Sequence, residues 1–377
     1  MLLVSEPCLG EAEKEALAQV VESGWITMGD RVRAFERAFA EEHGMADAVA
    51  VNSCTAGLHL AVVALGIGPG DEVLVPSLSF VATANCVLYA GATPVFVDIE
   101  SAQKPLMSLA DAARKCTQRT RAAIVMHYAG CVADGEAWRR FADERRLRLI
   151  EDAAHAAGAY RAGTFGDAAA FSFFGNKNMT TAEGGMVFAR DRAVLEQMRQ
   201  LRGHGMTSDT KQRLAARSAS YDVTMLGWNY RMDEFRAAIG LVQLKFLRRW
   251  NERRANIARV YRSALAERCT GVCVPFSDAG YESSRHILPA VLPDGSDRDA
   301  VMGHMREAGV QTTVHYPPIH RMSLYRDRLP PQRLPITEDF ARRELSLPLH
   351  PKLEDWDVEK VVNALANALA RQGPTRH

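Results

Sequence analysis

From residue 46 to about residue 190 the chain alternates between short apolar segments and amphipathic ones, and this alternation constrains the fold more than any other feature. Apolar runs of this length predict strands buried on both faces, and the helical spacing between them predicts crossover helices. Such strands form a mainly parallel sheet, so we expect an α/β fold. The predicted strands are residues 48–51, 73–76, 94–97, 122–127 and 147–152, and the predicted helices are 55–65, 80–90, 108–116 and 135–146.

The two ends of the chain follow other patterns. Additional helical segments are predicted at residues 11–23, 31–43, 191–202 and 234–268. After residue 269 a smaller α+β unit is predicted, with strands at 287–292 and 310–314 and helices at 297–308 and 354–371. We therefore expect two domains, a large α/β domain over residues 1–250 and a smaller C-terminal α+β domain over residues 251–377.

The composition is typical of a globular protein in water. The 46 Lys and Arg residues nearly balance the 45 Asp and Glu residues, so the net charge favours neither nucleic acid nor an anionic membrane as a partner. No apolar stretch has the length of a membrane span, and the N-terminus lacks a signal-peptide pattern. The seven cysteines are scattered, without a C-x-x-C pair. We expect free thiols, no metal site and a cytoplasmic location.

Polar residues follow several of the predicted strands, where ligands bind in α/β folds. The segment 52–57, Asn-Ser-Cys-Thr-Ala-Gly, lies between a strand and a helix. The N–H groups and dipole of a helix N-terminus bind phosphate, although Ser53 or Thr55 could instead cap the helix without any ligand. Farther along, Phe80 follows another strand, and its ring either packs in the core or stacks on a flat ligand.

Acidic and basic groups follow two later strands. Asp152 lies in the segment Glu-Asp-Ala-Ala-His after the strand that ends near residue 150. Carboxylates there must be solvated or paired, and one of them suits a cationic ring nitrogen. Ser172 and Lys177 lie in a stretch where an apolar run breaks and then resumes after Gly184-Gly185. A lysine between two buried strands is partly desolvated, which favours a free, nucleophilic amine; a solvated hairpin lysine is the alternative.

These four groups together suit one cofactor, pyridoxal 5′-phosphate (PLP). Its aldehyde condenses with a lysine amine, and its pyridine nitrogen stays protonated opposite a carboxylate. Its phosphate binds at a helix N-terminus, and its flat ring accepts an aromatic neighbour. Each group is ambiguous alone, but the combination predicts a PLP site.

Three blocks resemble the signature of the DegT/StrS family, which consists of fold type I PLP enzymes that are mostly sugar-nucleotide aminotransferases. They are Asp152-Ala153-Ala154-His155, Phe171-Ser172-Phe173-Phe174-Gly175-Asn176-Lys177 and Glu183-Gly184-Gly185. The resemblance extends over nearly the whole chain, because further blocks match in the right order: residues 24–27, 53–57, 76–85, 227–232 and 315–318. It implies a fold type I large domain with a mainly parallel sheet and a smaller C-terminal domain.

The resemblance implies roles for individual residues. Lys177 binds the cofactor and moves a proton between the substrate carbon and the cofactor. Asp152 pairs with the pyridinium nitrogen, His155 contacts the phenolic oxygen of the ring, and Phe80 stacks on the ring face. The phosphate is bound by Thr55, Ala56 and Ser172, and also by Asn229 from the partner subunit of a homodimer with shared active sites.

Two residues of the C-terminal domain, His315 and Tyr316, border the sugar pocket in this scheme. The chain departs from the family at Ala182, where glycine is usual; alanine strains the loop if the position needs a positive φ angle. Residues 101–108 also replace a block that often carries an Asp-Pro pattern, and nothing functional follows from that difference.

The function implied is transamination from glutamate to a keto sugar, in particular a nucleotide-linked hexose with its keto group at C-3 or C-4. Three alternatives stay open: an aminotransferase for a keto-cyclitol, a PLP-dependent sugar dehydratase, and a non-catalytic regulator on the same fold. The dehydratases of this family carry histidine at the lysine position, so Lys177 argues against that reading. A regulator could lose the lysine or the carboxylate, yet Lys177 and Asp152 are both present.

Overall fold

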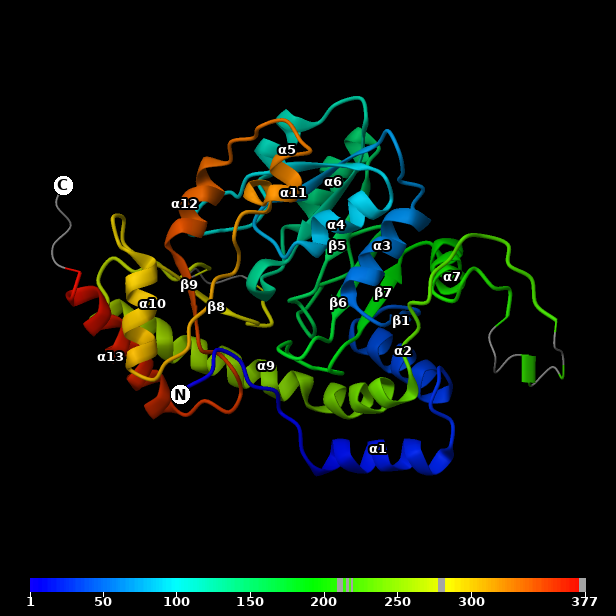
Figure 1. The fold of residues 1–377 in the computed structure, drawn as a ribbon, viewed down its shortest axis with the longest axis horizontal. Coiled ribbons are helices and arrows are strands. Elements are labelled where there is room, and N and C mark those ends of the chain that lie inside the picture. The colour runs from blue at the N-terminus through cyan, green and yellow to red at the C-terminus, as the bar shows by residue number, and fades with distance from the viewer. Residues whose placement is uncertain (209–212, 215–216, 218–219, 277–281, 373–377) are drawn as a thin grey trace.

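The structure is a computed structural model that describes residues 1–208, 213–214, 217, 220–276 and 282–372, and a seven-stranded sheet lies at its centre (Figure 1). The strand order is β1-β7-β6-β5-β4-β2-β3, and only β7 runs against the others. The strands are β1 (Val49–Val51), β2 (Glu72–Pro76), β3 (Thr93–Val97), β4 (Thr120–Met126), β5 (Arg148–Asp152), β6 (Ala168–Ser172) and β7 (Gly185–Ala189).

Helices cover both faces of this sheet, as the crossover connections of parallel strands require. Helices α3, α4 and α7 cover one face, and α2, α5, α6 and the first part of α9 cover the other. Their bounds are α1 (Glu11–Ser23), α2 (Asp30–Glu42), α3 (Cys54–Ala64), α4 (Ala82–Tyr89), α5 (Leu109–Lys115), α6 (Gly135–Arg145), α7 (Arg192–Leu201) and α9 (Glu234–Arg268), with a 3-10 turn η1 (Tyr128–Gly130) after β4.

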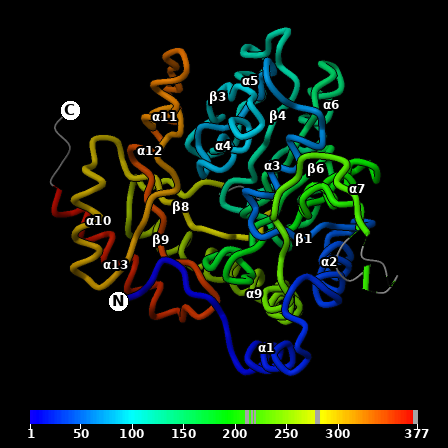
Figure 2. Tube along the Cα trace, turned by 45° about the vertical axis from the view of Figure 1, so that its right-hand side comes forward, coloured from blue at the N-terminus to red at the C-terminus, as the bar shows by residue number. Residues whose placement is uncertain are grey.

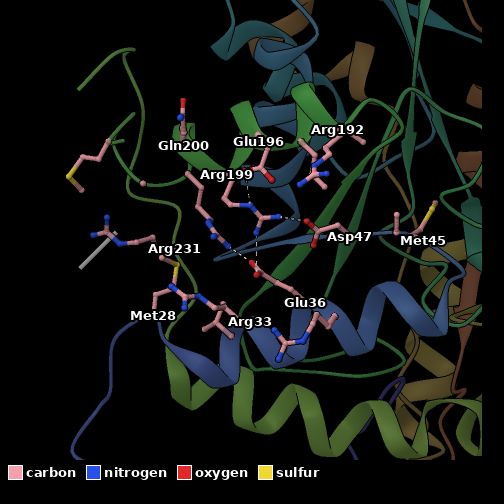
Figure 3. A pocket seen from close by; sticks show the side chains of 18 of the residues that line it. Met28, Arg33, Glu36, Met45, Asp47, Arg192, Glu196, Arg199, Gln200 and Arg231 are labelled. Carbon is pink, nitrogen blue, oxygen red and sulfur yellow. Dashed lines mark hydrogen bonds and ion pairs between the residues drawn. The ribbon is translucent and has the colours of Figure 1, made fainter. Parts of the chain in front are cut away.

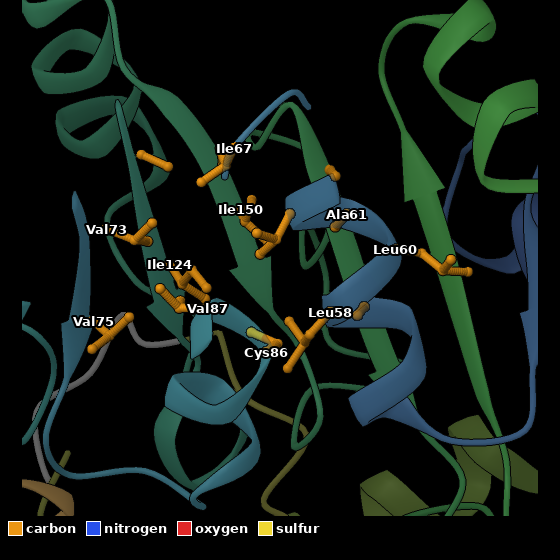
Figure 4. Close-up of a cluster of buried hydrophobic side chains, with 14 of the residues drawn as sticks. Leu58, Leu60, Ala61, Ile67, Val73, Val75, Cys86, Val87, Ile124 and Ile150 are labelled. Atoms are coloured by element: carbon orange, nitrogen blue, oxygen red, sulfur yellow. The ribbon is translucent and has the colours of Figure 1, made fainter. Parts of the chain in front are cut away.

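Alternate strand residues face opposite layers, so each strand contributes to two cores. Val73 and Val75 of β2 pack with α3 and α4, where Leu58, Cys86 and Val87 complete the cluster (Figure 4). The residue between them in β2, Leu74, faces the opposite layer. All five residues of β2 are therefore buried, which explains the nearly continuous apolar runs in the sequence.

The C-terminal part of the chain forms a two-stranded antiparallel sheet with helices beside it. Its elements are β8 (Leu288–Val291), α10 (Arg298–Glu307), η2 (Ile319–Arg321), α11 (Ser323–Arg326), α12 (Pro335–Arg343), β9 (Glu344–Leu347) and α13 (Asp355–Ala370). The N-terminus also lies here in both the ribbon and the tube view, because Leu2 forms a bridge with Val310 (Figure 2).

Helix α9 joins the two parts. Its first half packs against α2, where Gly240 contacts Phe35, and its second half contributes Ile257 and Tyr261 to the core around β8, β9 and α13. The predicted boundary between residues 250 and 251 thus falls inside one continuous helix. The division into domains 1–250 and 251–377 remains a prediction.

The sequence predicted the α/β class and its mainly parallel sheet correctly. The predicted strand at residues 310–314 is wrong, because Val310 and Thr313 form only isolated bridges, with Leu2 and with Ser346. The true partner of β8 is β9, a four-residue strand that the sequence did not reveal. Segments this short carry too little periodicity to be recognised.

Within the described ranges, no helix combines the length and the apolar character needed to cross a bilayer. Across the same residues, no group of three or more His, Cys, Asp and Glu side chains is placed to hold a metal ion. The seven cysteines are free thiols.

The contact between α9 and α2 generates a test with two glycine variants. A Cβ on Gly240 would lie 2.6 Å from Cζ of the fully buried Phe35, so Gly240→Ala overpacks this core despite the better helix propensity of alanine. We expect a loss of about 1–2 kcal/mol in the free energy of unfolding in urea. Gly303→Ala in α10 is the matched control, because no atom lies within 4 Å of its Cβ. It should gain about 0.5–1 kcal/mol, and equal effects of both variants would contradict this packing.

Candidate active site

The carboxyl ends of β1, β2, β5 and β6 meet at one edge of the sheet, and the predicted site residues follow them. Open α/β sheets bind ligands in the crevice outside this edge, and we use the word crevice below for the region around Asp152, Ser172 and Lys177. Asp152 is the last residue of β5, Ser172 is the last residue of β6, and Lys177 lies in the loop between β6 and β7. The sheet topology therefore brings together residues that lie far apart in the sequence.

Asp152 is a buried carboxylate with two hydrogen bonds. Its Oδ2 accepts from Thr83 Oγ1 at 2.6 Å and its Oδ1 accepts from the N–H of Ala154 at 3.1 Å. Burial raises the pKa of this carboxyl, while the hydrogen bond from Thr83 and the charge of Lys177 act in the opposite direction. A buried carboxylate of this kind is stabilised by a nearby cation.

The neighbouring acid, Glu151, has a different role. It accepts hydrogen bonds from the N–H groups of Gly163, Phe165 and Gly166, and His127 Nε2 lies 2.9 Å from its Oε2. These bonds fold the loop that leads into β6. Of the two acids that end β5, Glu151 binds backbone N–H groups of this loop, whereas Asp152 faces the crevice.

Lys177 projects into the same crevice, and its Nζ lies 3.3 Å from His286 Nε2. Burial lowers the pKa of the amine to about 8, although Cys54 and Asp152 act to raise it. The neutral amine is therefore well populated just above neutral pH. The Lys177 side chain is half-buried and its amine is desolvated, which favours the free amine over the alternative of a solvated hairpin lysine.

Three histidines surround this amine. The rings of His155 and His286 lie 4.3 Å apart, and His315 lies 6.4 Å from His155. Burial lowers the pKa of each ring, and the charge of Lys177 acts in the same direction. His155 Nε2 lies 2.8 Å from the hydroxyl of Tyr316. Neutral imidazoles are thus the principal polar neighbours of the lysine on this side.

His315 is held by the second sheet. Its N–H donates to Glu344 Oε2 at 2.9 Å, and its Nδ1 lies 2.8 Å from Ser346 Oγ. Ser346 Oγ in turn donates to Glu344 Oε1 at 2.7 Å. Burial raises the pKa of the Glu344 carboxyl to about 8. Strand β9 therefore fixes His315, and with it the adjacent Tyr316, at the mouth of the crevice.

The start of α3 lies beside Ser172 and Gly185, which pair with each other in the sheet. Ser53 caps the helix, because its hydroxyl accepts from the N–H of Ala56 at 3.1 Å. Only glycine fits at position 185, since a Cβ would lie 2.7 Å from the backbone N of Cys54. The helix-cap interpretation of segment 52–57 is confirmed, and its binding of a phosphate stays a prediction.

Phe80 and Asn229 both lie at the surface. The Phe80 side chain is 58% exposed and its ring lies 6.2 Å from that of Tyr316, so the interpretation of Phe80 as a core residue is wrong. Asn229 is exposed, and its carbonyl accepts from Asn52 Nδ2 at 3.3 Å. Its role in a partner's site stays a prediction.

Sequence reasoning missed four residues of this crevice: Thr83, Asn178, His286 and Glu344. Thr83 lies four residues after Ser79, one helical turn away, and this spacing could have linked it to the strand end. Asn178 directly follows the lysine. No signal in the sequence pointed to His286, which precedes β8, or to Glu344 in β9, because both reach the crevice only through the tertiary fold.

A separate cavity of about 1190 Å³ lies beyond β1, between α2 and α7 (Figure 3). At its base Glu36 accepts from Arg202 at 2.5 Å and from Arg199 at 3.4 Å. Glu36 also accepts from the N–H of Ala50, and Arg202 donates to the Ala50 carbonyl. These bonds satisfy the open edge of β1, which otherwise exposes unpaired backbone groups. The cavity is therefore distinct from the crevice that holds Lys177.

A desolvated lysine amine and a buried carboxylate, whose charges interact at the carboxyl edge of a mainly parallel sheet, suit a PLP-dependent enzyme. The chain belongs to the DegT/DnrJ/EryC1/StrS aminotransferase family, whose model matches residues 7–366. It is thus a member of a family of PLP-dependent aminotransferases, and the resemblance noted in the sequence is confirmed.

Solved structures agree with this assignment. The aminotransferase TlmJ from Streptoalloteichus hindustanus is 37% identical, with a TM-score of 0.92 over 99% of this chain and 100% of that one. DesI, solved in the presence of its TDP-sugar product, is 32% identical, with a TM-score of 0.88 over 98% and 93% of the two chains. The putative sugar aminotransferase Spr1654 from Streptococcus pneumoniae, in its PMP form, is 29% identical, with a TM-score of 0.91 over 98% and 99%.

Ala182, in the loop that follows Lys177, has a φ of 67°, so this position does adopt the conformation that favours glycine. We expect Ala182→Gly to raise the free energy of unfolding by about 0.5–1 kcal/mol, because relief of backbone strain exceeds the added freedom of the unfolded chain. Urea denaturation measures the change. Ala193→Gly, at an exposed helical site in α7, should instead lose about 1 kcal/mol. A loss at both positions would show that residue 182 is not strained.

The burial of Lys177 predicts a distinctive pH dependence of its reactivity. In the cofactor-free, full-length protein, trace labelling with acetic anhydride should rise through a midpoint near pH 8, because only the neutral amine reacts. Mass spectrometry of the Lys177 peptide gives the labelled fraction. Asp152→Asn should move the midpoint to lower pH, since the carboxylate favours the charged amine. A midpoint above pH 10 would mean that the amine is solvated.

Proposed function

We propose that this chain is a PLP-dependent aminotransferase that transfers the amino group of glutamate to a keto sugar, a nucleotide-linked hexose with its keto group at C-3 or C-4. The observation that carries the proposal is the desolvated amine of the half-buried Lys177, with a pKa lowered to about 8, at the same sheet edge as the buried Asp152 carboxylate. Support for the nucleotide sugar comes from DesI, solved with a TDP-sugar product, and support for the cofactor from the PLP and PMP forms of Spr1654.

Groups in the crevice fit PLP. The buried Nδ1 of His155 has no hydrogen-bond partner among the described residues, and Phe80 exposes its ring at the mouth. The Asp152 carboxylate, raised in pKa by burial, suits a cationic ring nitrogen. The close approach at Gly185 leaves the start of α3 free of side-chain bulk. When bound, the cofactor supplies an aldehyde carbon for the lysine and an electron-withdrawing ring.

Each predicted residue has a place in this proposal. Lys177 would bind the cofactor, Asp152 would pair with its ring nitrogen, His155 would contact its phenolic oxygen and Phe80 would stack on its ring. The phosphate would be held at the start of α3 by Thr55, Ala56 and Ser172. The N–H of Ala56 already donates to the Ser53 hydroxyl. Ala56 would therefore contribute through its small size and position as much as through its N–H group.

Lys177 also moves the proton. An amine with a pKa of about 8 can take a proton from a carbon and return it to another near neutral pH without a large energetic penalty in either direction. The surrounding histidines are neutral, so they do not compete for a positive charge near this amine. Burial at the same time keeps water from the reacting atoms.

The proposal includes the assembly. The partner subunit's Asn229 would reach the phosphate, which makes the site a property of a homodimer, and the segment that carries Asn229 lies exposed on this chain. His315 and Tyr316 would border the sugar, at the junction between the proposed domains 1–250 and 251–377. We also propose a cytoplasmic location, in keeping with seven unpaired cysteines.

The test is a screen of keto-sugar nucleotides and keto-cyclitols with glutamate, following the formation of 2-oxoglutarate and the absorbance of the cofactor. The wild-type spectrum should change to that of the pyridoxamine form with glutamate alone. Lys177→Ala should lose this change and reduce turnover by about 10²–10⁴-fold or more. Lys14→Ala, on the exposed face of α1, is the control and should behave as wild type.

Three outcomes would decide against parts of the proposal. No spectral change with any amino acid would exclude transamination. Turnover with keto-cyclitols but with none of the keto sugars would show that the substrate is a keto-cyclitol. Unchanged biological activity of Lys177→Ala would favour a regulator.

A further inference from the structure

Two asparagines connect the crevice to the long helix α9. Asn251 donates from Nδ2 to the carbonyl of Ala157 at 3.0 Å, and its Oδ1 lies 2.7 Å from Asn178 Nδ2. Asn178 Nδ2 also donates to the carbonyl of Ser284 at 2.7 Å. Each of the two asparagines therefore donates to a backbone carbonyl, a group that can only accept hydrogen bonds.

These carbonyls fix the orientation of both amides. The Asn251 group that faces the Ala157 carbonyl must be the NH₂ group, which leaves its oxygen facing Asn178. Asn178 must then direct its own NH₂ group toward that oxygen, and the Ser284 carbonyl requires the same orientation. Flipping either amide would bring two oxygens within hydrogen-bond distance of each other, so neither flip is compatible with its neighbours.

The orientation of Asn178 determines the tautomer of His286. Asn178 Oδ1 lies 2.9 Å from His286 Nδ1 and carries no hydrogen, so Nδ1 must be the protonated nitrogen of the ring. His286 is buried, and Lys177, His155, Arg254 and His315 face it; together these lower its pKa well below the usual value. In the neutral ring Nε2 then has a free lone pair, 3.3 Å from Lys177 Nζ.

We propose that His286 is the hydrogen-bond acceptor that positions the amine of Lys177, and that Asn178 and Asn251 act through it by holding its tautomer. The proposal deepens the proposed function and rests on the role of Lys177 there. A neutral amine that donates one hydrogen to His286 keeps its single lone pair for the carbon or proton with which it reacts. This chain of hydrogen bonds, the relay, also links three parts of the fold to the amine: the loop after β6, helix α9 and the segment that leads into β8.

A purely structural role is the competing explanation, because Asn178 and Asn251 also tie the lysine loop to α9. The two roles differ in one respect. If the two asparagines only hold the loop to α9, either nitrogen of His286 can carry the proton. If they position the amine through His286, the proton must be on Nδ1.

The first test is the tautomer itself, in the full-length protein labelled with ¹⁵N-histidine and freed of carbonyl compounds by hydroxylamine. The pair of ring signals that disappears in His286→Gln belongs to this residue. We expect a protonated Nδ1 and an unprotonated Nε2 at pH 8. A protonated Nε2 would overturn the proposal. The result does not depend on substrate turnover, so it separates failure of the relay from failure of the proposed aminotransferase activity.

The second test measures the pKa of Lys177 by trace acetylation in the same material. His286→Phe removes the acceptor that favours the charged amine and should lower the pKa by about one unit. His286→Gln can still present an oxygen to the amine and should stay close to wild type, which also serves if the phenylalanine variant folds poorly. His59→Phe is the matched control, because His59 is a buried histidine on α3 that contacts Tyr230.

A double-mutant cycle separates the two explanations further. Asn178→Leu should lower the pKa of Lys177 by about half a unit, since His286 then loses the partner that holds its tautomer. In the double variant with His286→Phe, the leucine should add no further shift, because it acts only through the imidazole. Additive shifts, or an unchanged pKa in His286→Phe, would overturn the proposal.

Discussion

The site depends on removing one lysine amine from water. The sheet brings Lys177 to the carboxyl edge among buried strands, and burial alone accounts for most of the fall in its pKa to about 8. Negatively charged neighbours could have reversed this effect, but the nearest rings are neutral histidines, and the pKa of the nearby Asp152 carboxyl is itself raised. Near neutral pH the amine can therefore be neutral, as a nucleophile and base must be, and it can also be protonated when it has to carry a proton.

Parts of the fold are arranged to keep that environment dry and fixed. Asp152 is held by Thr83 from α4, and Lys177 is approached by His286 from the segment that leads into β8. His315 is fixed by β9 through Ser346 and Glu344. The crevice therefore draws on the large sheet, the small sheet and a helix at once.

The sequence predicted those parts of the structure that rest on local patterns. Buried parallel strands reveal themselves as apolar runs, so the large sheet and its helices could be assigned, and residues at strand ends could be grouped into a site. What it could not reveal were contributions that depend on distant contacts. His286 and Glu344 carry no local signature, and β9 is too short to show a period. The sequence left open whether Phe80 lies in the core, and its exposure decides the question. For Ala182 the sequence predicted strain only if the backbone adopts a positive φ angle, and the observed φ of 67° fulfils that condition.

The pairing of the first residues with the far end of the chain has a practical consequence. The backbone of Leu2 forms hydrogen bonds with residues 309 and 311, and the carbonyl of Val4 accepts from the N–H of Leu349. The N-terminal segment therefore packs as part of the C-terminal unit before the chain enters the large sheet. A tag or truncation at the N-terminus therefore perturbs the packing around β9, and through β9 the placement of His315.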